Sequence, residues 1–136
     1  MGTILRTVDS VNLKQIIISK NSADVYNPKV IRSTMGAIFR VNVIEVDNLL
    51  ETVSEMKKQK YKVMATSLNT DKNIYDVNLK KVAIIIGNES NGVSEELLNK
   101  ADGHIKIPML GKTESLNASV AASIVMYEYI RQVTCN

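Results

Sequence analysis

The strongest constraint on the fold is the regular alternation of short apolar runs with helical patterns. Runs of β-branched and other apolar residues indicate buried strands at residues 14–19, 41–46, 61–67, 81–86 and 103–108. Helical patterns occur at residues 2–12, 27–39, 47–60 and 117–133. Parallel strands need long crossover connections, which are usually helices, and continuous apolar strands are typical of sheets covered on both faces. The alternation therefore predicts an α/β fold with a mostly parallel sheet and helices on both faces.

Several local signals set the expected boundaries of these elements. Asp47 is the expected N-cap of the helix at 47–60, and Pro28 opens the helix at 27–39, which ends near Gly36. The polar stretch at 69–78 is expected to be a mobile loop.

Length and composition exclude several classes of protein. The 136 residues form one expected domain, without an apolar run long enough to cross a membrane and without a signal-peptide pattern at the start. The single Cys135 builds neither a disulfide framework nor a zinc site, so no metal is expected. A cytoplasmic location is the resulting expectation. The net charge of +3 permits an anionic partner such as RNA without requiring one.

Two polar loops follow late strands and are the candidate ligand-binding segments. The stretch "IIIGNESNG" (84–92) opens after a strand, where α/β sheets bind ligands, but it lacks the Gly-Lys-Ser/Thr ending of a phosphate-binding loop. The stretch "IPMLGKTESLNASVAASI" (107–124) leads into a helix whose first turns carry small side chains. From the residues alone, two ordinary turns and a tightly packed helix are the preferred explanation of both loops.

Other polar residues favour structural roles. Glu95 and Glu96 follow Ser94 in the first turn of a helix, where acidic side chains are favourable. His104 is the only histidine and lies within a strand pattern without a metal-binding partner nearby in sequence. We therefore expect none of these side chains to be catalytic.

Three segments in order give the chain a resemblance to a known family. They are "MGTILRT" (1–7), "IIIGNESNGVSEELL" (84–98) and "IPMLGKTESLNASVAASIVMYE" (107–128). The chain resembles, over its whole length, the SpoU (TrmH) family of RNA ribose 2′-O-methyltransferases in the SPOUT superfamily. The resemblance implies a SpoU-type methyltransferase domain over residues 1–136, with a deep trefoil knot at the carboxyl end of a parallel sheet. It also explains the small residues at the start of the last helix, because a helix tucked through a loop needs a slim end.

The resemblance implies that the two loops hold S-adenosylmethionine, with the end of a third strand as a further wall. The implied cofactor-binding residues are Thr66, Ser67, Leu68, Gly87, Asn88, Ile107, Met109, Leu110, Gly111 and Leu116. Apolar side chains with free backbone groups suit adenine, and Gly87 and Gly111 are expected to let the backbone approach the ligand.

By the same resemblance Arg6 is the catalytic arginine, and Glu89 and Asn117 support it from the second and third motifs. Arg6 is expected to stabilise negative charge on the ribose 2′-oxygen, and Asn117 also suits a helix cap. The residues alone leave open an exposed Arg6–Asp9 pair of little consequence. Arg32 and Arg40 are the weaker candidates for RNA contacts.

The resemblance also implies a homodimer centred on the carboxyl-terminal helix, an rRNA or tRNA substrate, and neither a metal nor a membrane. In the family an asparagine and a complete strand precede the glycine that matches Gly2. We therefore expect the first strand and any amino-terminal RNA-binding domain to be missing here. The alternative is a SpoU-like module that binds RNA or the cofactor without catalysis.

Overall fold

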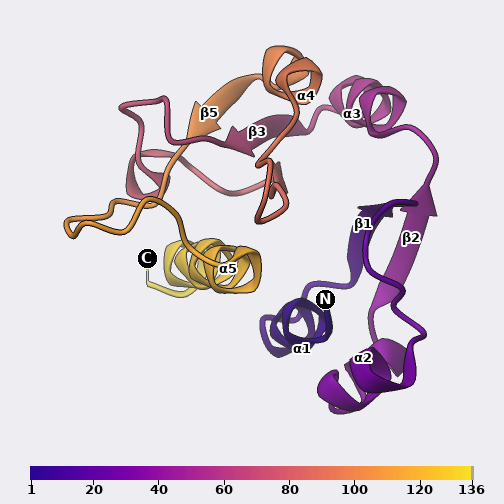
Figure 1. The fold of residues 1–136 in the computed structure, drawn as a ribbon. Helices are drawn as coiled ribbons and strands as arrows, with labels where there is room; N and C mark the ends of the chain where they lie inside the picture. Colours follow the sequence, from indigo (N-terminus) through magenta and orange to yellow (C-terminus); the bar gives the residue numbers. More distant parts are fainter. Residues whose placement is uncertain (136) are drawn as a thin grey trace. The chain divides into compact units, whose positions relative to one another are not determined.

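The computed structural model describes residues 1–135, which form two compact units, Met1–Asn48 and Leu49–Asn136 (Figure 1). The first unit contains α1 (Gly2–Ser10), β1 (Gln15–Ser19), α2 (Pro28–Ser33), the 3-10 helix η1 (Ala37–Phe39) and β2 (Asn42–Val46). The second contains α3 (Leu49–Lys58), β3 (Lys62–Thr66), the 3-10 helix η2 (Ile74–Asp76), β4 (Val82–Ile85), α4 (Glu95–Lys100), β5 (Gly103–Ile105) and α5 (Ala118–Thr134).

All five predicted strands are present, and every registered pair is parallel, which confirms the predicted mixed α/β class. The strands form two sheets, β1–β2 in the first unit and β4–β3–β5 in the second. Each unit thus has a parallel sheet of its own. In the larger sheet, the register places Lys62 beside Val82 and Met64 beside Gly103.

The central strand β3 is covered on both faces. Val63, Met64 and Ala65 are consecutive and all are buried, although successive side chains of a strand point to opposite faces. Val53 of α3 is also buried, and α3 contacts both β3 and α4. Met64 belongs to the core cluster that includes Val125 of α5. Figure 1 shows α5 on the side of this sheet opposite to α4.

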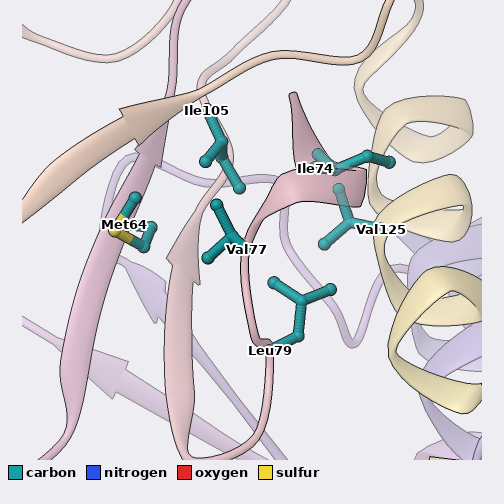
Figure 2. Packing of buried hydrophobic residues seen from close by; sticks show 6 residues of the cluster. All are labelled: Met64, Ile74, Val77, Leu79, Ile105 and Val125. Carbon is teal, nitrogen blue, oxygen red and sulfur yellow. The ribbon is translucent and has the colours of Figure 1, made fainter. Parts of the chain in front are cut away.

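The core of the second unit contains residues from a segment predicted to be a mobile loop. Ile74 and Val77 pack with Met64, Ile105 and Val125 (Figure 2). The backbone of this segment is also held, since Ile74 N donates to Lys106 O at 2.9 Å and Lys106 N donates to Lys72 O at 2.9 Å. The prediction for residues 69–78 was therefore wrong at its apolar positions, because two isolated apolar residues in a polar stretch give no periodic signal.

Side chains near the end of α5 fasten it to the segment before β4. The Gln132 amide accepts a hydrogen bond from Leu79 N at 2.8 Å and donates to Val77 O at 2.9 Å. The buried Glu128 carboxylate accepts from Arg131 through two bonds of 2.8 Å. The hydrogen bonds from Arg131 lower the pKa of Glu128, and burial partly opposes this shift.

The first unit is held by close packing of α1 on α2. Leu5, Val8 and Val11 are buried, and a Cβ added at Gly2 would lie 1.6 Å from Ser33 Oγ. Glycine at position 2 therefore lets the two helices touch.

The helical boundaries near α2 agree with prediction, whereas the one before α3 does not. Pro28 stands in the first turn of α2 behind an Asn27 cap, and the backbone turns at Gly36 with φ of +84°. Helix α3 begins at Leu49, and the Asp47 carboxylate forms an ion pair with Lys20. Asp47 therefore lies two positions before the first residue of α3, and its capping role stays a prediction. Among residues 1–135, none of the helices combines the length and the apolar character that a membrane crossing requires.

Candidate functional site

The first candidate loop, residues 87–92, is shaped by the side chain of Asn88. Asn88 Oδ1 accepts hydrogen bonds from Ser90 N at 3.0 Å and from Asn91 N at 2.7 Å, while Gly92 N donates to Asn88 O at 3.0 Å. Asparagine commonly closes turns in this way. Asn88 thus organises the loop that carries Glu89, which is a structural role beside the predicted contact with a cofactor.

The structure explains the need for glycine at position 87 differently from the prediction. A Cβ at Gly87 would lie 2.2 Å from the carbonyl carbon of Gly92 and 2.4 Å from Val93 N, so the loop's own backbone occupies that space. The predicted free approach of a ligand to Gly87 was therefore wrong on this side. Gly111 has nothing within 4 Å of an added Cβ and is exposed, so its backbone is open to a ligand.

Glu89 and Asn117, predicted from separate motifs, are in direct contact. Asn117 Nδ2 donates to Glu89 Oε1 at 2.7 Å. The same Asn117 caps α5, because its Oδ1 accepts from Ser119 N at 2.9 Å and from Ser119 Oγ at 2.6 Å. One side chain therefore joins the loop at 87–92 to the start of α5. We call this pair of residues, Glu89 and Asn117, the loop latch.

Residues at the end of β3 are tied to both neighbouring strands. Thr66 Oγ1 donates to Ile85 O at 3.1 Å, and Ser67 N donates to Ile105 O at 3.0 Å. Ser67 Oγ also accepts from Asn69 N at 3.1 Å. These bonds position the carboxyl end of β3, where the exposed Leu68 begins the next loop.

An open cavity of about 370 Å³ lies beside this strand end. Its lining residues are Leu68, Asp71, Asn73, Lys106, Ile107, Pro108, Met109 and Leu110. Four of them, Leu68, Ile107, Met109 and Leu110, are predicted cofactor residues, and Leu110 is fully exposed at the rim. The predicted residues Thr66, Ser67, Gly87, Asn88, Gly111 and Leu116 are not part of this lining.

Sequence reasoning missed the polar side of the cavity. Asp71, Asn73 and Lys106 belong to segments that were interpreted as a loop and a strand end. Asn73 Oδ1 is buried and has no hydrogen-bond partner among residues 1–135. An asparagine in a polar stretch carries no signal that its side chain will be buried beside a cavity.

Arg6 lies in the first unit, on the exposed face of α1. Within residues 1–135 its side chain makes no hydrogen bond or ion pair, so the alternative of an Arg6–Asp9 pair, left open by the sequence, is excluded. Asp9 instead accepts three hydrogen bonds of 2.7 to 3.1 Å from Arg40. The bond to Arg40 lowers the pKa of Asp9 and raises that of Arg40. Arg40 is thus engaged, whereas Arg32 is exposed on α2.

The residues expected to be structural have structural partners. Ser94 caps α4 by accepting from Leu97 N at 3.4 Å, with Glu95 and Glu96 in the first turn. His104 Nε2 lies 2.7 Å from Leu98 O. In the described part of the chain, no group of three or more histidine, cysteine or acidic side chains is placed to hold a metal ion.

The chain is similar to methyltransferases in both sequence and structure. The SpoU rRNA Methylase family matches residues 1–127. A protein of Staphylococcus epidermidis named for the TrmH family of tRNA/rRNA methyltransferases is 40% identical over 133 residues, which cover 97% of this chain and 53% of that protein.

Two solved structures extend the comparison. The SpoU methyltransferase AviRb from Streptomyces viridochromogenes, in complex with the cofactor AdoMet, matches with a TM-score of 0.91 and 29% identity, covering 99% of this chain and 56% of that one. An RNA 2′-O ribose methyltransferase matches with a TM-score of 0.87 and 30% identity, covering 97% and 51%.

The chain spans about half the length of the relatives that it matches. Within that span the family match includes both candidate loops and the helix that carries Arg6. The chain belongs to the SpoU rRNA Methylase family.

Proposed function

We propose that this chain is the catalytic part of an enzyme that transfers a methyl group from S-adenosylmethionine to a ribose 2′-hydroxyl of tRNA or rRNA. The observation that carries the proposal is the loop latch, which joins the second and third family motifs through a hydrogen bond of 2.7 Å. Relatives named for tRNA/rRNA methyl transfer, a neighbour solved with AdoMet and another named for RNA 2′-O ribose methylation support it.

The cavity beside β3 fits such a cofactor in size and chemistry. Its volume of about 370 Å³ is in the usual range for small-molecule sites. Leu68, Ile107 and Leu110 offer apolar surface to a flat base, and Asn73 Oδ1, which has no hydrogen-bond partner among the described residues, offers an acceptor nearby. The open backbone at Gly111 adds peptide groups that a ligand can approach.

For this reaction the protein mainly has to align the methyl group with the ribose 2′-oxygen and stabilise the negative charge that develops on that oxygen. S-adenosylmethionine supplies a methyl group on a positively charged sulfur, which is already activated for transfer. Arg6 carries a positive charge and has donors but no acceptor, so we assign it to stabilising the 2′-oxygen as its proton leaves. Its guanidinium is exposed on α1 and has no partner within residues 1–135, so it is available for this role. The loop latch holds the cofactor loops in place.

The assembly is part of the same proposal. Helix α5 leaves about half of the Val120 and Tyr127 side chains exposed. We propose that this surface packs against a second copy in a two-fold dimer and that the chain forms the family's knot. If the chain forms this dimer, light scattering will give twice the monomer mass, and Tyr127→Glu will lower the measured mass toward that of the monomer.

Methyl transfer is tested with tritiated S-adenosylmethionine and total tRNA or rRNA. A methyl group on the 2′-oxygen prevents that oxygen from attacking the adjacent phosphodiester, so the labelled product will resist alkaline hydrolysis as a dinucleotide. Label released as single nucleotides would instead place the methyl group on a base. Calorimetry with S-adenosylmethionine provides a separate measurement. Binding of the cofactor without any transfer to RNA would favour the non-catalytic binding module.

A further inference from the structure

The first unit exposes three large apolar or aromatic side chains within one short segment. Phe39 is 87% exposed, Tyr26 is 68% exposed and Met35 is 67% exposed. Single exposed apolar residues are common, but a group of them in a polar surface marks an interaction site. We call Met35, Phe39 and the neighbouring Arg32 the Phe39 surface.

The backbone holds Met35 outward between two buried residues, and Phe39 follows at the end of the 3-10 helix η1. Thr34 and Ala37 are fully buried, and Thr34 Oγ1 donates to Ile31 O at 2.8 Å. Between them Met35 has φ of +51° and Gly36 has φ of +84°. A methionine rarely adopts a left-handed conformation, so the fold maintains this turn against the preference of the residue. The exposure of the Phe39 surface therefore follows from a defined turn.

The segment that carries this surface is basic, between the flanking acidic residues Asp24 and Glu45. Residues 25–44 contain Lys29, Arg32 and Arg40 and no acidic residue. Arg40 is held by Asp9 through a two-pronged pair and also lies beside Gly36. Lys29 and Arg32 make no side-chain ion pair within residues 1–135. The positive charge available to a partner at this surface is therefore carried by Arg32, with Lys29 one turn before it on α2.

We propose that the Phe39 surface binds an unpaired nucleotide of the RNA substrate, with the Phe39 ring stacked on the base and Arg32 bound to a phosphate. The inference rests on the proposed function, since it names the form of RNA that the enzyme accepts. A flat aromatic face beside cations is the usual platform for single-stranded RNA. The absence of acidic residues in this segment suits a polyanion. Bases in a duplex are already stacked on each other, so this surface selects unpaired nucleotides.

The test is fluorescence anisotropy with a labelled single-stranded RNA of mixed sequence and with the same RNA annealed to its complement. Phe39→Ala will weaken single-stranded binding by about ten-fold, the scale of one lost base stack, and leave duplex binding nearly unchanged. Phe39→Trp will retain the affinity. Arg32→Ala will weaken both and lower the slope of log affinity against log salt by about one. Tyr75→Ala is the matched control, because Tyr75 is an exposed aromatic residue of the second unit.

Three results would overturn the inference. The first is an equal affinity of the wild type and of Phe39→Ala for single-stranded RNA. This result would refute the inference without contradicting the proposed methyl transfer or cofactor binding. The second is a lower molecular mass of Phe39→Ala in light scattering, which would make this surface a contact between copies of the chain. The third is a wild type that binds S-adenosylmethionine in calorimetry but no RNA.

Discussion

Substitutions of Asn117 separate its two functions, which are the cap of α5 and the hydrogen bond to Glu89. Asn117→Asp keeps an oxygen that can accept from Ser119 N, and aspartate is as good an N-cap as asparagine. The same change removes the donor to Glu89 and places two carboxylates face to face. Asn117→Ala removes both the cap and the latch. Both variants therefore lose the latch, and they differ in the cap and in the added carboxylate opposite Glu89.

The expected magnitudes follow from these contacts. Asn117→Ala loses the N-cap, worth about 1 kcal/mol, together with the latch, so it will lower the free energy of unfolding by about 1.5 to 2 kcal/mol. Asn117→Asp keeps the cap and will lower it by about 0.5 to 1 kcal/mol, the contribution of the latch. Because the latch is exposed, its charge-assisted bond contributes only about 0.5 to 1 kcal/mol after solvent screening. If the latch holds the cofactor loops, both variants will bind S-adenosylmethionine about two- to five-fold more weakly.

The reciprocal change provides the control. In the double variant Asn117→Asp, Glu89→Gln, the glutamine amide can donate to the new carboxylate, which restores the bond with its direction reversed. Urea unfolding and calorimetry on the four proteins of this cycle measure the coupling between the two positions. Cofactor affinity equal to wild type in Asn117→Asp would show that the latch does not organise the site.

Three further predictions follow from other contacts. Arg6→Ala will lower the methyl-transfer rate by about two orders of magnitude at nearly unchanged cofactor affinity, and Arg6→Lys will rescue it poorly; a near wild-type rate in either would remove Arg6 from the mechanism. Gly87→Val will destabilise the fold by roughly 1 to 3 kcal/mol in urea melts, because its side chain overlaps the loop backbone, whereas Gly111→Val will unfold like wild type and weaken only cofactor binding. The pKa of Glu128 is lowered in the folded state by Arg131, so this carboxylate stabilises the protein above its unfolded pKa and the stabilisation is lost as pH falls through the folded pKa. Glu128→Gln will therefore flatten the acid side of a stability–pH profile, and an unchanged slope would contradict this.

Most of the secondary structure and both candidate loops could be predicted from the sequence. All five strands and the helices at 2–12, 47–60 and 117–133 were predicted to within a few residues at their ends. These elements follow from the apolar period along the chain, which is a local property. The N-cap at Asn117 and the helix that begins at Pro28 were likewise predictable, because they depend on residues only a few positions away.

Contacts between residues far apart in the sequence could not be predicted, because they depend on how the elements pack. Asp9 pairs with Arg40, thirty-one positions away, and not with Arg6 on its own helix. Ile74 and Val77 enter the core from a polar stretch, and the space beside Gly87 is filled by Gly92. The latch between Glu89 and Asn117 spans twenty-eight positions. The division of the strands into two parallel sheets likewise depends on tertiary packing. None of these contacts leaves a periodic trace in the sequence, because each depends on how separate segments pack once their apolar faces are buried.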